Sequence, residues 1–109
     1  MTLMDSDWVR RKARMQEYDL SSHAHRERQE EQITVREIEQ ILLKGAIIER
    51  YPNDLRGQSC LVAGSVARKS LHVVCGTRGE RLLVITVYRP KLPVWINTTT
   101  RAKELQSRE

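Results

Sequence analysis

The sequence has little cysteine and lacks any long hydrophobic run, and each absence excludes a class of protein. Cys60 and Cys75 stand in apolar runs without CxxC spacing or a nearby histidine pair. This pattern favours buried free thiols over a disulfide or a zinc site. No segment approaches the roughly 18 apolar residues that span a bilayer, and the N-terminal segment lacks the apolar core of a signal peptide. We therefore expect a cytoplasmic protein with no membrane partner.

Positive charge is the main excess of the chain. Its 109 residues are enough for one domain and include 19 Lys and Arg against 14 Asp and Glu, which gives a formal net charge of +5. A basic surface favours RNA or an acidic protein as the partner. The five glycines fall at expected turns and form no nucleotide-binding loop, so the sequence predicts no cofactor.

Residues 1–20 are expected to form a basic helical arm, with a helix over residues 5–17 that Asp5 or Ser6 caps. The thin apolar stripe of this helix predicts weak docking on the domain, or docking only on a partner. The stripe consists of Met4, Trp8, Val9 and Met15. The helix also carries a run of cations, Arg10, Arg11, Lys12 and Arg14. Such a run is more typical of a solvated helix face than of a phosphate site, which is the alternative.

Two more helices are expected before the sheet begins. Residues 22–32 carry acids and bases at helical spacing. The following helix has clearer signals: Thr34 and Glu37 make a capping box, and an apolar stripe with a 3.6-residue period follows. Gly45 is expected to end this helix in a left-handed conformation.

From Ala46 the pattern changes to β-branched runs separated by turn residues, which predicts about four antiparallel strands. Helices followed by a meander indicate an α+β fold, with the helices packed on one face of the sheet. We expect this domain to cover residues 21–97 and a polar tail to cover residues 98–109. The second face of the sheet is then a platform for a ligand, RNA above all, unless the N-terminal helix covers it.

Two strands carry polar side chains on one face. Side chains alternate between the two faces of a strand. His72 therefore lies on one face of its strand, and Thr86 and Tyr88 lie with the other even-numbered residues on one face of the next strand. If the hairpin pairs Cys75 with Arg81, Thr86 is the diagonal neighbour of His72. A slip of one residue would change these neighbours, and the sequence does not determine the register.

These side chains suit RNA cleavage without a metal. That reaction needs a base for the ribose 2′-OH, an acid for the leaving 5′ oxygen, and cations for the phosphate. Histidine exchanges protons near neutral pH, Arg26 and Arg28 can donate two hydrogen bonds to a phosphate, and Tyr88 can donate a hydrogen bond or stack on a base. The alternative for His72, which stands beside valines, is a packing role. The three histidines are His23, His25 and His72.

A metal site on the first histidine pair is disfavoured. His23 and His25 differ by two positions, which places them about 200° apart around a helix, whereas helical metal pairs need i,i+4 spacing. They cannot chelate one ion from a regular helix. We therefore predict no metal site, and expect one of the two to be a solvated surface residue.

Several blocks between residues 21 and 95 together resemble the domain-of-unknown-function family numbered 4258. They are "SSHAHRERQEEQIT", "EIEQILLKGAIIERYPND", "SCLVAGSV", "LHVV" and "ITVYRPKLPVW". The resemblance implies a small bacterial protein with a fold similar to the ribonuclease toxins of the RelE and barnase type. It also implies a toxin of a toxin–antitoxin pair, with RNA as the target and an antitoxin protein as the partner.

The resemblance can be carried over position by position. It matches His23, Tyr51, His72, Thr86, Tyr88 and Trp95. There is also a departure, because the family pattern has arginines four and eight residues after the first histidine. Glu27 and Glu31 hold those positions here, so a phosphate clamp would depend on Arg26 or Arg28.

The leading hypothesis is a metal-independent endoribonuclease with His23, His72 and Tyr88 as catalytic candidates. Substrate binding would use Arg26, Arg28, Thr86, Tyr51 and Trp95. The site forms only if the helix bearing His23 lies against the polar sheet face; otherwise that helix is a solvated surface helix. One alternative is a non-catalytic module that binds RNA or an acidic protein through a basic face. Another is a structural partner, such as a homodimer, joined through a free edge strand.

Overall fold

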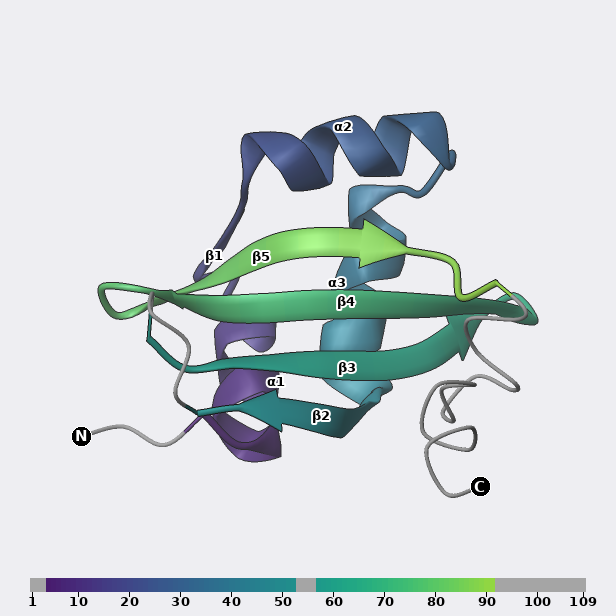
Figure 1. The fold of residues 1–109 in the computed structure, drawn as a ribbon. Coiled ribbons are helices and arrows are strands. Elements are labelled where there is room, and N and C mark those ends of the chain that lie inside the picture. Colours follow the sequence, from purple (N-terminus) through teal and green to yellow (C-terminus); the bar gives the residue numbers. More distant parts are fainter. Residues whose placement is uncertain (1–3, 53–56, 92–109) are drawn as a thin grey trace, which may run out of the picture.

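The computed structural model describes residues 4–52 and 57–91, which form three helices and a five-stranded sheet (Figure 1). The helices are α1 (Ser6–Arg14), α2 (Ser22–Glu30) and α3 (Val35–Lys44). The strands are β1 (Tyr18–Leu20), β2 (Ala46–Tyr51), β3 (Ser59–Val66), β4 (Lys69–Arg78) and β5 (Arg81–Tyr88). The predicted α+β class is confirmed. Trp95 and the predicted tail at residues 98–109 lie outside the described residues.

The sheet has the order β1-β5-β4-β3-β2 and is mixed rather than fully antiparallel. The meander β2 to β5 matches the four predicted strands, but β1 adds a fifth that runs parallel to β5. Its three residues are too few to give a strand signal in the sequence. Tertiary bonds hold β1 in place, because Tyr18 Oη donates to Glu39 Oε1 at 2.8 Å and Arg81 donates twice to Asp19. Burial and the bond to Glu39 raise the pKa of Tyr18 to about 12.

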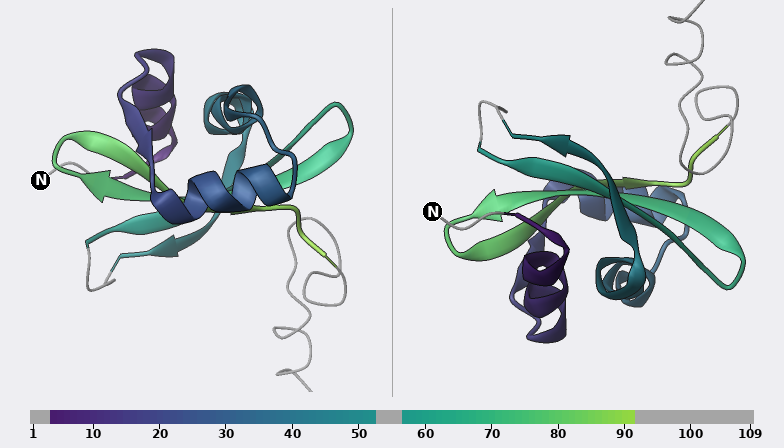
Figure 2. Two further views of the ribbon diagram at one scale, coloured as in Figure 1. Left: turned by 90° about the horizontal axis from the view of Figure 1, so that it is seen from above. Right: turned by 90° about the horizontal axis from the view of Figure 1, so that it is seen from below.

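Two helices cover one face of the sheet. Figure 2 shows α1 and α3 on the same side, while α2 lies along the β5 edge. The core between the helices and this covered face includes Val9, Ile38, Ile41, Leu42, Val62, Val73 and Val84. We call the opposite side the far face; it carries Ser59, Leu61, His72, Val74, Thr86 and Tyr88. No helix of residues 4–52 or 57–91 covers the far face (Figure 2).

The first helix docks more firmly than its stripe predicts. Trp8, Val9 and Ala13 are buried, and α1 packs on α3 and β5. Ala13 completes the apolar side of the helix, whereas Met15, which the predicted stripe included, is 61% exposed. Ala13 is small, so it gives a weak hydrophobic signal in the sequence although it permits close packing. The sequence therefore underestimates the contact of α1 with α3 and β5.

The predicted N-caps are present in α1 and α3, but the predicted conformation at the end of α3 is not. Asp5 accepts from the Trp8 amide, and the capping box of Thr34 and Glu37 is present. Gly45, however, has an extended backbone (φ −76°, ψ 175°), so the left-handed stop predicted there is wrong. Glycine is needed there for space, because a Cβ atom would lie 2.6 Å from the Ile41 carbonyl oxygen.

The β4–β5 hairpin has a different register from the one considered in the sequence. Arg78 pairs with Arg81, so that His72 lies opposite Tyr88. A β-bulge follows the pair of Val74 and Thr86, and it interrupts the period-2 alternation. As a result, the even-numbered residues of β5 do not share one face: Leu82 and Val84 point into the core, while Thr86 and Tyr88 lie on the far face.

Candidate functional site on the far face of the sheet

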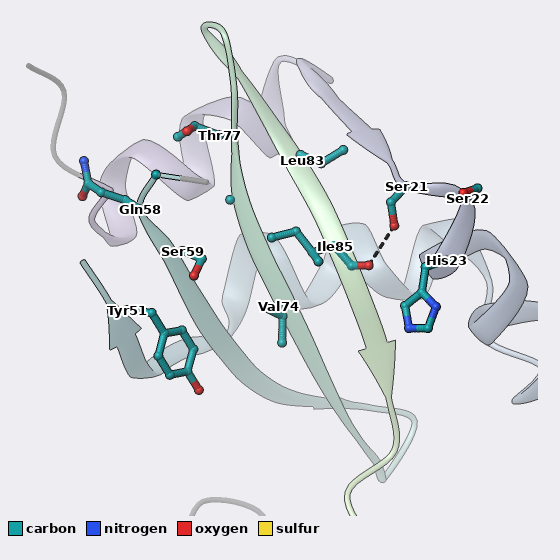
Figure 3. A pocket seen from close by; sticks show the side chains of 12 residues that line it. Ser21, Ser22, His23, Tyr51, Gln58, Ser59, Val74, Thr77, Leu83 and Ile85 are labelled. Carbon is teal, nitrogen blue, oxygen red and sulfur yellow. Dashed lines mark hydrogen bonds between the residues drawn. The ribbon is translucent and has the colours of Figure 1, made fainter. Parts of the chain in front are cut away.

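Ser21 fixes the start of α2 against β5. Its hydroxyl accepts from the Ala24 amide at 3.0 Å and donates to the Ile85 carbonyl at 2.7 Å, while its own amide donates to the Val84 carbonyl. Ile85 is the residue that the bulge adds, and its carbonyl is the one that accepts from the Ser21 hydroxyl. One serine therefore caps the helix and attaches it beside the far face (Figure 3).

Glu27 joins α2 to the far face. Its Oε1 atom accepts from the Thr86 hydroxyl and from the Val87 amide, the latter at 3.1 Å. Its Oε2 atom lies 3.3 Å from His23 Nε2, one helical turn earlier. The His23 side chain remains 60% exposed, whereas that of Glu27 is 25% exposed. A partly buried carboxylate thus orients an accessible imidazole.

His72 and Tyr88 form a second pair on the same face. They lie directly opposite each other on β4 and β5, with the His72 Nδ1 atom 3.2 Å from the Tyr88 hydroxyl and the rings edge to face. His72 is fully buried and Tyr88 is half-buried. Thr86 stands two residues from Tyr88, about 7 Å along the strand. The two pairs therefore form one polar row: His23, Glu27, Thr86, Tyr88 and His72.

A pocket of about 820 Å³ adjoins this row at His23. Its floor is apolar, and Tyr51 lies across the floor from His23 (Figure 3). The described residues that line it are Ser21, Ser22, His23, Tyr51, Gly57, Gln58, Ser59, Val74, Gly76, Thr77, Leu83 and Ile85. This set includes neither lysine nor arginine. The pocket therefore offers a flat apolar surface with a polar rim, which suits a planar ring better than a bare phosphate.

The predicted phosphate clamps make contacts elsewhere. Arg28 donates to His25 Nδ1 at 3.3 Å and to the Ile33 carbonyl at 3.5 Å. Arg26 is exposed and lies about 200° around α2 from the buried Ala24, so it points away from the sheet. Tyr51, by contrast, lines the pocket.

Metal binding has no obvious place in the described part of the chain. No group of three or more His, Cys, Asp or Glu side chains in residues 4–52 and 57–91 is arranged to hold an ion. His23 and His25 face different partners, Glu27 and Arg28 respectively, as their spacing predicts.

Glu27 is a member of the site that the sequence predictions do not include. It stands out in the sequence only as a departure from the family pattern, although its spacing of four residues from His23 on a helix is a usable signal. Its bonds to β5 could not have been predicted, because they depend on the bulge and on the helix packing at the strand edge.

Comparison with curated proteins and with solved structures gives no match. Among the residues that the structure describes, no helix is long and apolar enough to cross a membrane. A family model does match, over residues 20–89, which is more than half of the chain and leaves α1 outside. The chain belongs to the family described as "Domain of unknown function (DUF4258)".

Proposed function

We propose that this protein is a metal-independent endoribonuclease of the toxin kind, with the polar row as its catalytic centre. The observation that carries the proposal is the pairing of the accessible His23 imidazole with the Glu27 carboxylate at the rim of the pocket. A histidine held by a carboxylate is a common arrangement for general acid–base chemistry. The toxin assignment rests on the resemblance of the sequence blocks.

His23 is the proposed general base. Its Nε2 atom lies 3.3 Å from Glu27 Oε2 in the free protein, and Nδ1 is the ring atom left to face a substrate. Nδ1 would take the proton of a ribose 2′-OH, and the 2′ oxygen would then attack the adjacent phosphorus. The P–O5′ bond breaks, so the products are a 2′,3′-cyclic phosphate and a free 5′-hydroxyl. Glu27 stabilises the imidazolium that forms.

Tyr88 is the proposed proton donor for the leaving 5′ oxygen. Tyr88 is partly exposed. The Nδ1 atom of the buried His72 lies 3.2 Å from the Tyr88 hydroxyl and orients it. His72 is therefore a positioning residue here and does not contact RNA. Thr86 lies between the two pairs and keeps the Glu27 carboxylate in place.

The pocket would bind the nucleotide next to the cleaved bond. A base can lie on the floor formed by Val74, Leu83 and Ile85, with Tyr51 at the opposite wall. Stacking and apolar contact of this kind are typical of single-stranded RNA recognition. Cations for the phosphate are absent from the described lining residues, so Arg26 would have to serve the backbone from the outer side of α2.

The test is growth of a bacterial host that expresses the wild-type chain, His23→Ala or Tyr88→Phe, with total RNA examined in parallel. We expect arrest and RNA breakdown in the wild type and relief in both variants. The matched control is His25→Ala, because His25 is an exposed histidine of the same helix that faces Arg28 instead. Absence of arrest with soluble wild-type protein would overturn the proposal, as would equal relief by His25→Ala.

A second candidate is a non-catalytic module that binds RNA or an acidic protein through α1. The cations Arg11 and Arg14 are exposed, and α1 packs on the covered face, away from the pocket. Charge reversal of Arg11 and Arg14 should then weaken binding and reduce its salt dependence, while His23→Ala leaves binding unchanged. Binding that fails with His23→Ala instead would favour the far-face site.

A further inference from the structure

Two cysteines that are far apart in sequence meet in the core. Cys60 of β3 and Cys75 of β4 are direct partners across the antiparallel ladder, and their Sγ atoms are 3.7 Å apart. Both side chains are buried, and both thiols are reduced. They lie on the covered face, so this pair is separate from the polar row and the pocket.

The backbone already satisfies the requirements of a disulfide. Residues directly opposite each other in an antiparallel pair have Cα atoms about 4.5–5.5 Å apart, and disulfides accept roughly 4.4–6.8 Å. Closing the sulfur distance to a bond length of about 2.05 Å requires rotation of two side chains and little movement of the strands. We propose that Cys60 and Cys75 are an oxidation site at which a peroxide oxidant forms an intramolecular disulfide.

The reaction balances with hydrogen peroxide as the oxidant. The Cys60 thiolate attacks one peroxide oxygen, which breaks the O–O bond, gives a sulfenic acid and releases water after protonation. The Cys75 sulfur then attacks the Cys60 sulfur; the S–S bond forms, the S–O bond breaks, and the Cys75 proton leaves with the hydroxyl group as a second water. Two thiols are thereby oxidised and one peroxide is reduced.

The environment gives the two cysteines different roles. Two neighbouring groups lower the pKa of Cys60. They are the Cys75 thiol, through a hydrogen bond, and the positive charge of Arg50, the β2 residue that pairs with Cys60. The hydrogen bond to Cys60 and burial raise the pKa of Cys75. Because Arg50 is the cross-strand partner of Cys60 and not of Cys75, its positive charge favours Cys60 as the attacking thiolate and leaves Cys75 as the resolving thiol.

Oxidation would tie β3 to β4 directly behind the pocket. Ser59 and Gly76, the chain neighbours of the two cysteines, form a cross-strand pair and line the pocket on the other side of the sheet. The link would join residues 15 positions apart, which restricts the unfolded chain. For a domain of this size we expect the melting temperature to rise by on the order of 10 °C.

The test treats the purified full chain with hydrogen peroxide at low protein concentration and then counts thiols under denaturing conditions. We expect both thiols to be lost together, the intact mass to fall by two hydrogens, and a peptide map to join Cys60 to Cys75. The melting temperature should rise, and a thiol reductant should restore the thiol count and the melting temperature of the untreated protein. This experiment needs no variant, so a failure to fold cannot obscure it.

The matched control is Cys75→Ser, which removes the resolving thiol but keeps a small polar side chain. Oxidation of this variant should stop at a sulfenic or sulfinic acid on Cys60, with a gain of oxygen instead of a loss of hydrogen. Two thiols that persist in the wild type after treatment, or a disulfide-linked dimer as the main product, would overturn the proposal.

Discussion

The two faces of the same sheet differ in what their side chains contact. On the covered face, Val62, Val73 and Val84 are fully buried against α1 and α3. On the far face, His23 and Thr86 each contact the Glu27 carboxylate beside a pocket with an apolar floor. Apolar burial stabilises the first face, while specific hydrogen bonds determine the arrangement of the second. The apolar core and the candidate site therefore lie on opposite sides of one sheet.

The covered face should respond most strongly to the loss of volume. Ile38→Ala removes a fully buried side chain from α3, and we expect the free energy of unfolding to fall by about 2–5 kcal/mol. Urea denaturation measures this change. A loss below about 1 kcal/mol would contradict the assignment of this face as the source of stability.

Close packing between α3 and β3 provides a second test of the covered side. In Gly45→Ala the new methyl group would meet two backbone oxygens, those of Ile41 and Ala63, within 2.8 Å. We expect a loss of about 1–3 kcal/mol in unfolding free energy. In Gly64→Ala the nearest atom is the tip of the Ile41 side chain at 3.0 Å, which can move, so the loss should be smaller. Equal losses would refute this account of Gly45.

The capping box should contribute less than the core. Thr34→Ala leaves the Glu37 amide without its side-chain acceptor, and we expect a loss of about 1 kcal/mol in chemical denaturation.

The same box has a pH dependence. The hydrogen bond from the Thr34 amide lowers the pKa of Glu37 in the folded state below its ordinary value of 4.5, with Arg89 as a lesser cause. A lowered folded-state pKa stabilises the fold above the unfolded value and loses that effect as the pH falls. The stability difference between wild type and Glu37→Gln should therefore shrink below a pH of about 4.5. A difference that grows in acid would contradict this assignment.

The far face should show the smallest change in stability and the largest change in activity. His23 is 60% exposed, so His23→Ala should alter the unfolding free energy by about 0.5 kcal/mol or less. We expect the RNA cleavage rate of the same variant to fall by about 100-fold or more, because a general base contributes at that scale.

Glu27→Gln keeps an oxygen for Thr86 and Val87 but loses the charge beside His23. It should lie between the wild type and His23→Ala in cleavage rate.

The sequence predicted the covered face better than the far face for a physical reason. Hydrophobic periodicity repeats along α3, β3 and β4, so each additional residue strengthens the prediction, and the caps at Asp5 and Thr34 are local signals of a few residues. The structure confirms both caps. Tertiary contact overrode the local signal at β1, where three residues form a strand only because β5 lies beside them.

The far face depends on details that no local pattern encodes. One bulge at Ile85 changes which side chains of β5 share a face, and the carbonyl of this bulge residue accepts from Ser21. The pairing of His72 with Tyr88 follows from the hairpin register, which the sequence left undetermined. The residue types of the site were therefore predictable, but their neighbours were not. The roles assigned to His23, His72 and Tyr88 remain predictions until activity is measured.

The most direct measurement is RNA cleavage by the purified wild-type chain and by His23→Ala, with a chelator present throughout. The substrates are a single-stranded RNA and the same oligonucleotide with 2′-deoxy sugars. We predict that the wild type cuts only the RNA and leaves 2′,3′-cyclic phosphate ends, and that folded His23→Ala cuts the RNA at least about 100-fold more slowly. Intact RNA after incubation with folded wild-type protein, or equal cleavage by the variant, would contradict this prediction.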